Sequence, residues 1–252
     1  MNVRPIRYNA RKAMSDQPKE PPHSTRVRYR PPSEILEISP ADAIWPPLSP
    51  AALLRAPPTL FIAGDAQLLK EPRRVSIVGA RQATESGQRR AAKLARQLAS
   101  AGVVVVSGLA RGIDHAAHTS TIEAGGRTIA VIGTTLAQCY PAEHTRLQEL
   151  LYQEHLVISQ HRAGTRTTPA SFPARNRIMA MISDASVIVE ASDTSGSLSQ
   201  ASETQRLGKP LFIMRNVVET KGLKWPASFL KHGAIVLDDV KQILDALSSR
   251  GP

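Results

Sequence analysis

Short apolar segments alternate with amphipathic ones from residue 75 to the end of the chain. An uninterrupted apolar run of about 4–8 residues is typical of a buried strand, and apolar residues at steps of three and four are typical of a helix. The first run ends at Gly79, and the first helical pattern ends at Gly102, where a C-terminal cap is expected. The predicted strands are 75–79, 103–106, 128–133, 156–159, 186–189, 211–214 and 234–237. The predicted helices are 86–101, 114–124, 143–154, 175–183, 198–207 and 240–247.

This alternation predicts the fold class. Strands that are apolar throughout are buried on both faces, which is typical of a parallel sheet covered by helices. Right-handed crossovers then give an α/β, doubly wound, mostly parallel sheet, an extended Rossmann-like domain. We assign residues 41–252 to this domain, with a short helix at 51–55 and a strand at 59–64 leading into it.

Residues 1–40 precede this pattern and are predicted to form a basic, proline-rich arm. Residues 1–32 hold eight basic and two acidic side chains and six prolines, with no helical or strand period. So little apolar surface does not offset the entropy of ordering, and we expect the arm to be disordered. Its charge fits nonspecific attraction to phosphates, and a solvated arm without a role fits equally well.

The composition narrows the classes of function. Hydrophobic residues make up 42% of the 252, which excludes wholesale disorder and a collagen-like chain. The longest aliphatic run, 103–106, is far short of the roughly 20 residues that cross a bilayer, and no secretory signal opens the chain. The lone Cys139 builds neither an internal disulfide nor a zinc site by itself. We expect a cytoplasmic protein without a membrane partner, and the net charge of +11 favours nucleic acid as the partner.

Two strand-to-helix junctions carry glycine beside residues that could bind a ligand. In such sheets, a ligand binds beyond the carboxyl ends of the strands. The first junction, 79–87, contains Gly79 and Arg81 but lacks the G-x-G-x-x-G spacing, so we predict no dinucleotide cofactor. A plain turn explains this junction equally well. The other junction contains Gly196 and Ser197 at a helix start. A serine nucleophile needs a positioned base, and the sequence shows none, so N-capping is the better interpretation.

A third junction follows the most hydrophobic strand. Its small residues let backbone N–H groups approach an anion at the positive end of a helix dipole. Arg111 lies among them and can fork onto a phosphate, while Asp114 fits an N-cap. His115 and His118 share a helix face, but no third ligand has suitable spacing, so we predict no metal site. The small residues are Ser107, Gly108 and Gly112.

The distribution of charge also favours binding of an anion. Neither the segment between Glu85 and Asp114 nor the segment between Glu154 and Asp184 contains a carboxylate, whereas both contain several basic residues. In the second segment an aromatic ring stands beside cations, and single strands bind such sites because bases stack on the ring while arginines follow the backbone. The alternative is that the ring pins a long loop to the core. The residues concerned are Phe172, Arg175, Asn176 and Arg177.

Together these motifs make the chain resemble the DprA/Smf family of DNA-processing proteins. Order and spacing agree over about residues 45 to 240, and the block at 107–114 is the most specific. The matching segments are VSIVGAR at 75–81, SGLARGID at 107–114 with His118, EAGGRTIAV at 123–131, YPAE at 140–143, FPARNRI at 172–178 and SGSL at 195–198.

The resemblance implies a Rossmann-like domain that binds single-stranded DNA without catalysing a reaction and without a cofactor. It also implies roles in DNA uptake and recombination, the loading of the RecA recombinase, and a homodimer. Carried over residue by residue, the DNA pocket falls on Arg81, Arg111, Phe172, Arg175, Asn176 and Arg177, and the glycine-serine loop on Gly196 and Ser197.

The chain departs from the family pattern in places. Ser199 and Gln200 stand where the family usually has Ile-Thr, and 214–216 replace a usual Val-Pro-Gly. We expect neither the usual helical domain before the sheet nor a winged-helix domain after it. These departures affect RecA loading and the dimer more than DNA binding, because partner surfaces are less constrained than a phosphate pocket.

Two other functions fit the same fold. The fold resembles that of nucleotide phosphoribohydrolases, which are N-glycosidases. Their catalytic acid is absent from the loop at 195–200, and Glu203 lies one helical turn after its position. A nucleotide-binding sensor that uses the same phosphate loops without chemistry is the second alternative.

Overall fold

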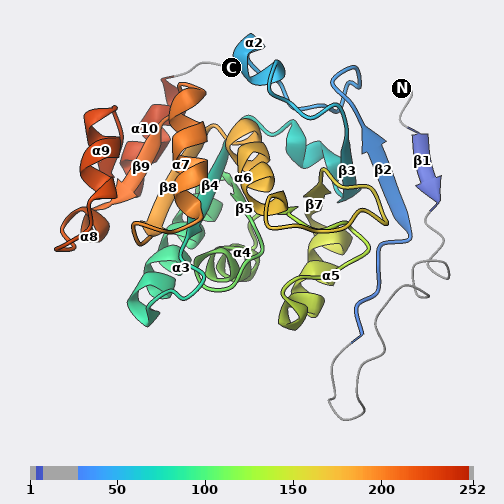
Figure 1. Cartoon of the computed structure of the whole chain (residues 1–252), viewed down its shortest axis with the longest axis horizontal. Coiled ribbons are helices and arrows are strands. Elements are labelled where there is room, and N and C mark those ends of the chain that lie inside the picture. Colours follow the sequence, from blue (N-terminus) through green and yellow to red (C-terminus); the bar gives the residue numbers. More distant parts are fainter. Residues whose placement is uncertain (1–3, 8–27, 250–252) are drawn as a thin grey trace.

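The computed structural model describes residues 4–7 and 28–249, whose strands form one ten-stranded sheet with helices on both faces (Figure 1). The strands are β1 (Arg4–Arg7), β2 (Glu34–Ile38), β3 (Leu60–Gly64), β4 (Arg74–Gly79), β5 (Val104–Ser107), β6 (Thr128–Ile132), β7 (Leu156–Ser159), β8 (Ala185–Glu190), β9 (Leu211–Met214) and β10 (Ile235–Leu237). The helices are α2 (Pro50–Leu53), α3 (Glu85–Ser100), α4 (Ile113–Glu123), α5 (Thr145–Glu154), α6 (Ser171–Ile182), α7 (Ser197–Arg206), α8 (Arg215–Val218), α9 (Trp225–Lys231) and α10 (Val240–Ser248), with 3-10 turns η1 (Ala66–Leu69) and η2 (Ala142–His144).

The order of the strands creates the crevice that concerns function. The order is β1-β2-β3-β7-β6-β5-β4-β8-β9-β10, and all strands from β7 to β10 in that row are parallel. From β4 the chain winds outward to β7, then returns beside β4 as β8 and winds the other way. The loops beyond β4 and β8 therefore diverge at this switch point and leave a crevice between them. The predicted doubly wound, mostly parallel, extended Rossmann-like fold is confirmed.

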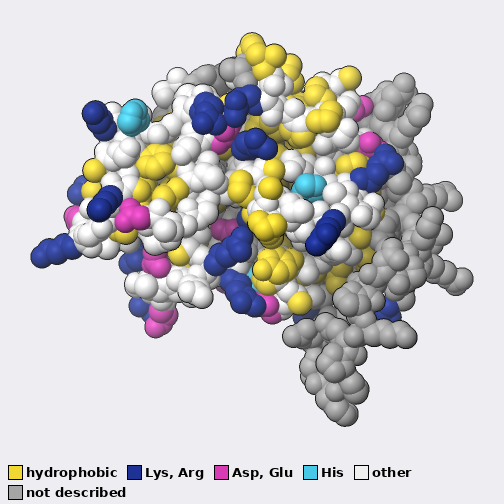
Figure 2. All heavy atoms as spheres, in the orientation of Figure 1, with side chains coloured by type: hydrophobic (Ala, Val, Ile, Leu, Met, Phe, Trp, Pro, Cys, Tyr) yellow, Lys and Arg dark blue, Asp and Glu magenta, His cyan; other side chains and the backbone are white. Residues whose placement is uncertain are grey.

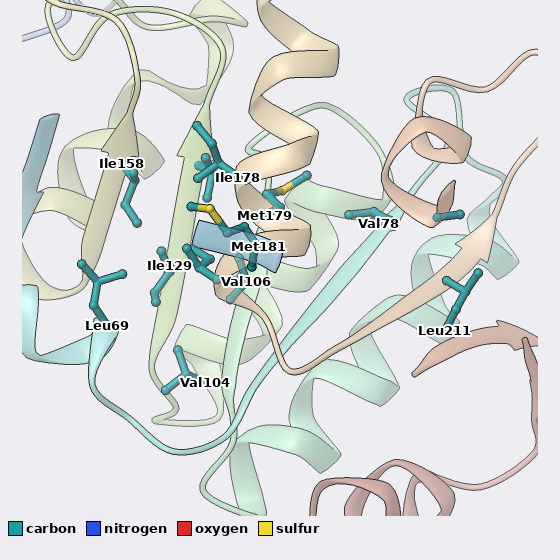
Figure 3. Packing of buried hydrophobic residues seen from close by; sticks show 14 of the residues in the cluster. Leu69, Val78, Val104, Val106, Ile129, Ile158, Ile178, Met179, Met181 and Leu211 are labelled. Carbon is teal, nitrogen blue, oxygen red and sulfur yellow. The ribbon is translucent and has the colours of Figure 1, made fainter. Parts of the chain in front are cut away.

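Two apolar layers hold the helices against the sheet. Helices α3, α4 and α10 cover one face, where Leu94 and Leu98 pack with Val75 and Ile77 of β4. Helices α6, α7 and α9 cover the other face, and Figure 3 shows α6 side chains packed over strand residues such as Val106 and Ile129. Fully burying one such side chain contributes about 1.5–3 kcal/mol. Burial on both faces explains why the strands read as continuous apolar runs.

The N-terminal edge of the sheet corrects the predicted arm. Strands β1 and β2 lie within residues 1–40 and extend the sheet beyond β3, with antiparallel pairing from β1 to β2, β2 to β3 and β3 to β7. Strand β2 is held because Ile35 and Ile38 are buried. The prediction of a disordered arm is therefore wrong for 4–7 and 34–38, because a short strand between prolines shows too weak a period. Residues 1–3 and 8–27 lie outside the described residues.

Other predicted elements agree within a few residues, with two exceptions. Helix α6 begins at Ser171, ahead of the predicted start at 175, so Phe172 lies in its first turn. Helices α8 and α9, between β9 and β10, were not predicted. In the described part of the chain, no helix combines the length and apolarity that a membrane span requires.

Candidate nucleic-acid interface

A cleft of about 1050 Å³ opens at the switch point of the sheet. The loops after β4 and β8, the N-terminal ends of α6 and α7, and α8 form its walls. Seven of the residues predicted for the site line it: Gly79, Arg81, Phe172, Arg175, Asn176, Gly196 and Ser197. Five others do not line it: Ser107, Gly108, Arg111, Gly112 and Arg177.

The start of α6 decides which of its residues reach the cleft. The Thr168 N–H donates to Ser171 Oγ at 3.1 Å, which closes the turn where the helix begins. Counted from Phe172 in the first turn, residues at steps of three and four share one face of the helix. That face carries Phe172, Arg175, Asn176 and Met179, all of which line the cleft.

Arg81 and Phe172 form a cation–π pair at the mouth of the cleft. The Arg81 Cζ lies 4.9 Å from the centroid of the Phe172 ring, and Tyr140 lies on another side of that ring at 5.8 Å between centroids. Phe172 packs on Gly133, where an added Cβ would lie 2.9 Å from ring atom Cδ1. Tyr140 is 55% exposed, and a second hollow of about 620 Å³ lies beyond the pair, lined by Arg81, Phe172, Tyr140 and the loop at 167–169. The Phe172 ring therefore packs on the loop at Gly133 and borders both hollows, while its predicted stacking with a base stays a prediction.

Arg175 is a buried cation that serves both the core and the cleft. Its Nη1 donates to Val131 O at 2.9 Å and lies 4.0 Å from Asp114 Oδ2. Burial lowers the pKa of Arg175 and raises the pKa of Asp114, and the charge of each partner opposes both shifts. An added Cβ on Gly108 would lie 1.6 Å from Arg175 Nη1. Gly108 therefore makes room for a guanidinium, which differs from the predicted approach of its backbone to an anion.

Arg111 is paired with a carboxylate instead of facing the cleft. Its Nη2 donates to Glu143 Oε2 at 2.9 Å, and its Nε donates to Oε1 of the same residue. The side chains of Arg111 and Glu143 are 63% and 48% exposed. This contact holds the pKa of Glu143 down at about 2 and raises the pKa of Arg111. The predicted phosphate fork is therefore already occupied by a neighbouring residue.

The small residues of the predicted site shape the loops. The Ser107 hydroxyl is buried and donates to Ile77 O at 2.7 Å, which ties β5 to β4. Gly112 has φ +72°, and an added Cβ there would lie 2.4 Å from Ala80 O, so only glycine fits this contact between loops. Asp114 accepts a hydrogen bond from the Ala110 N–H, whereas Gly112 is the N-cap of α4. The prediction that Asp114 caps this helix is wrong, because α4 begins at Ile113 and Asp114 already lies inside its first turn.

The glycine-serine loop is joined to α6 across the cleft. Asn176 Nδ2 donates to Gly196 O at 3.0 Å and to Ser199 Oγ at 2.8 Å. Ser197 Oγ lies 2.8 Å from Ser195 Oγ. Helix α7 begins after Gly196 without a side-chain cap, so the predicted N-capping by these serines is wrong. Space around Gly196 is open, with no atom within 4 Å of an added Cβ.

Arg177 lies on the opposite side of α6 from the cleft. It is exposed and lines a small hollow together with Arg55 and Glu203. Glu203, the acid considered for an N-glycosidase, faces this hollow too and accepts hydrogen bonds from Arg55. Arg177 therefore does not join Arg81 and Arg175 at the cleft, although the sequence predicted that it would.

The sequence did not predict that two further charged residues, Arg90 and Glu190, line the cleft. Glu190 ends β8, accepts from the Thr84 N–H at 2.8 Å and lies 3.6 Å from Arg90. Its place directly after a predicted strand was the signal that could have found it. The ionisable side chains of the cleft are Arg81, Arg90, Asp114, Arg175 and Glu190. Arg90 faces Glu190 and Arg175 faces Asp114, so Arg81 is the cleft cation that has no carboxylate within 4.0 Å among the described residues.

Comparison with known protein families shows to which family the chain with this cleft belongs. The model of the family described as DNA recombination-mediator protein A matches residues 37–248, which includes nearly all of the sheet and the whole cleft. The chain belongs to this family. The resemblance read from the motifs is thereby confirmed, and the family is one of DNA-processing proteins.

Relatives and solved structures of this family agree with the assignment. DNA processing protein DprA of Streptococcus pneumoniae is 43% identical over 112 residues, which are 44% of this chain and 40% of that protein. The X-ray structure of DprA from Streptococcus pneumoniae superposes with a TM-score of 0.75 at 34% identity, covering 83% of this chain and 73% of that one. A structure of DNA processing protein A from Helicobacter pylori, concerned with the single-stranded DNA binding mode of that protein, gives a TM-score of 0.72 at 28% identity and covers 85% of this chain and 96% of that one.

The matches to family members cover only part of their length. The matched region spans between 36% and 50% of the curated relatives. What this chain shares with the family is thus the sheet and the cleft at its switch point.

Proposed function

We propose that the chain binds single-stranded DNA without sequence preference in the cleft at the switch point. The observation that carries the proposal is the state of Arg81, an exposed guanidinium that stands over the Phe172 ring and faces no carboxylate among the described residues. A phosphate takes the fork of Arg81, and an unstacked base lies against the neighbouring aromatic rings. The single-stranded DNA binding of the Helicobacter pylori protein supports this assignment.

The shape of the site favours a single strand over a duplex. Phe172 and Tyr140 border hollows on two sides of Arg81, and base stacking on such rings requires bases that are not paired. Each stacked base contributes about 1–3 kcal/mol. Arg175 adds a further donor, because its buried Nε has no acceptor among the described residues. The net charge of +11 attracts a polyanion over longer distances.

The cleft offers little support for an N-glycosidase. General acid–base catalysis needs a carboxyl group within hydrogen-bond reach of the substrate. Asp114 is buried against Arg175, Glu190 is held by Thr84, and Glu203 faces another hollow. Incubation with nucleoside monophosphates and detection of released base tests this alternative. A melting temperature raised by mononucleotides but not by oligonucleotides would favour a nucleotide sensor instead.

Arg81→Gln tests the proposal directly. We expect about tenfold weaker binding of a fluorescent dT oligonucleotide in anisotropy titrations, because a charge-assisted contact to phosphate is lost. The log–log salt dependence should become shallower by about 0.7. Arg73→Gln is the matched control, since Arg73 is also an exposed arginine without an ion pair to any described residue but precedes β4 at the end opposite to the cleft.

Two results would contradict the assignment. One is that Arg81→Gln binds single strands like the parent at low salt. The other is that single- and double-stranded oligonucleotides bind equally and both variants lose the same affinity, since this would indicate attraction to net charge alone. RecA loading and a homodimer, which the resemblance implies, stay predictions.

A further inference from the structure

A second group of arginines surrounds one buried carboxylate near the C-terminal ends of α6 and α7. Glu203 is 3% exposed, and two arginines hold it. Arg55 Nε donates to Glu203 Oε1 at 2.9 Å, and Arg206 Nη1 donates to Oε2 at 2.7 Å. Arg177 lines the same hollow as Arg55 and Glu203. We call these four residues the arginine cluster.

The arginine cluster carries an excess of positive charge that its own residues do not neutralise. Arg55 and Arg206 share the single carboxylate of Glu203, and Arg177, which lines the same hollow, has no described carboxylate within 4.0 Å. The side chains of Arg55 and Arg206 are 41% and 58% exposed, and Arg177 is exposed as well. Each guanidinium has five N–H donors, so most donors of the cluster point to solvent. Like charges gathered in this way attract an anion.

Along α7 the arginine cluster lies beyond the cleft, whereas on α6 it lies on the side that is turned away from the cleft. In α7, Ser197 and Gln200 line the cleft, whereas Glu203 and Leu207 beyond them line the hollow of the cluster. From Ser197 to Glu203 helix α7 rises by about 9 Å. Figure 2 shows Lys and Arg side chains gathered in two places on this face, near the upper ends of α6 and α7 and below the lower end of α6. An extended strand of a few nucleotides spans such a separation.

We propose that the arginine cluster binds phosphate groups of the same single strand that occupies the cleft, a few nucleotides further along. This inference rests on the proposed function and adds a second contact surface to it. The free fork of Arg177 matches two phosphate oxygens, and the donors of Arg55 and Arg206 that Glu203 does not use add further contacts, which suits a flexible polyphosphate better than a compact ligand.

The length of the bound strand is the variable that tests this proposal. For Arg177→Gln we expect parent-like affinity for the shortest dT oligonucleotide that fills the cleft, and several-fold weaker binding of longer ones. The salt dependence for long strands should become shallower by about 0.7. Glu203→Gln should have the opposite effect, because it removes the only carboxylate of the cluster and leaves three arginines for the strand. Arg73→Gln controls for net charge and should bind like the parent at every length.

Several outcomes would overturn the proposal. One is an equal effect of Arg177→Gln on short and long strands, and another is no effect at any length. Two short oligonucleotides bound per chain would place a separate strand, instead of the same strand, on the cluster. Arg81→Gln measured in the same series keeps the two proposals apart. If Arg81→Gln weakens binding and Arg177→Gln does not, binding in the cleft is supported and the second contact at the arginine cluster is contradicted. If neither variant weakens binding, the proposed cleft is contradicted, and the proposed cluster with it. Thermal melting verifies folding, and Arg177 has no ion pair to a described residue that the substitution would remove.

Discussion

Two neighbouring loops carry the arginines that the sequence marks as phosphate ligands, and the structure uses them differently. Arg81, after β4, stands over Phe172 without a carboxylate partner among the described residues. Arg111, after the adjacent strand β5, is held by Glu143. Asp114, in the first turn of α4 directly after this loop, faces the buried Arg175. The loop after β4 thus presents its charge to a ligand, whereas the loop after β5 uses its charges to fix its own shape.

This difference shows what makes an arginine at a strand end a binding residue. Both side chains follow parallel strands at the same edge of the sheet, so both meet the positional requirement for ligand contact. What separates them is the nearest carboxylate, which competes with an incoming phosphate for the same guanidinium fork. Availability, more than position, therefore distinguishes the two loops.

The largest effect, on the free energy of unfolding, is expected from breaking the buried ion pair between Arg175 and Asp114. Arg175→Met leaves Asp114 buried without its counter-charge, and losing one partner of such a pair costs about 3–5 kcal/mol of unfolding free energy. The double variant Arg175→Met, Asp114→Asn should recover part of this loss. Urea denaturation measures both. A loss below about 1 kcal/mol for the single variant would mean that the pair does not hold the loop.

The same variant has a predictable dependence on pH. Burial raises the pKa of Asp114, and removal of Arg175 raises it further, since the cation is what opposes the shift. A carboxyl whose pKa is raised in the folded state favours folding when protonated and loses that contribution as pH rises through the folded pKa. The deficit of Arg175→Met should therefore shrink as pH falls. A deficit that grows on acidification would contradict this.

A smaller loss of stability is expected at Gly108. An alanine Cβ would lie 1.6 Å from Arg175 Nη1 in a buried site, so the guanidinium must move. Such overpacking costs about 1–3 kcal/mol. Gly196→Ala is the control, because the space there is open and its φ of −60° suits alanine, so the change should stay within about 0.5 kcal/mol. If the two variants melted alike, Gly108 would not be the residue that accommodates Arg175.

The sequence predicted the fold well because each strand is buried on both faces. The strands β4, β5, β6 and β8 are buried over nearly their whole length, and central strands of a helix-covered parallel sheet produce such apolar runs. Strand β2 was missed because its few apolar residues lie among prolines and glutamates. Helices α8 and α9 are too short to show a clear period.

The candidate site was predicted less completely, for two physical reasons. Pairing at long range is invisible in a single sequence: Glu143 lies 32 positions after Arg111, and Glu203 lies 148 positions after Arg55. The second reason is the phase of α6. Residues two apart on a helix point about 200° apart, so Arg175 and Arg177 cannot both face the cleft. The helix predicted at 175–183 already contained both residues, so its period was the signal that could have revealed this conflict. The observed start at Ser171 adds Phe172 to the face that carries Arg175.

The smallest expected effect, on the affinity for single strands, comes from releasing Arg111 from Glu143. Glu143→Gln frees the fork of Arg111, so single strands should bind a few-fold more tightly, with a salt dependence steeper by about 0.7. The pKa of Glu143 is about 2 instead of 4.5, so this carboxylate is ionised from pH 8 to pH 5, and the ratio of variant to parent affinity should stay constant over that range. Glu37→Gln, which frees Arg162 at the far edge of the sheet, is the matched control and should leave binding unchanged. Equal gains in both variants would show that net charge acts alone, and no gain at Glu143 would place Arg111 outside the path of the strand.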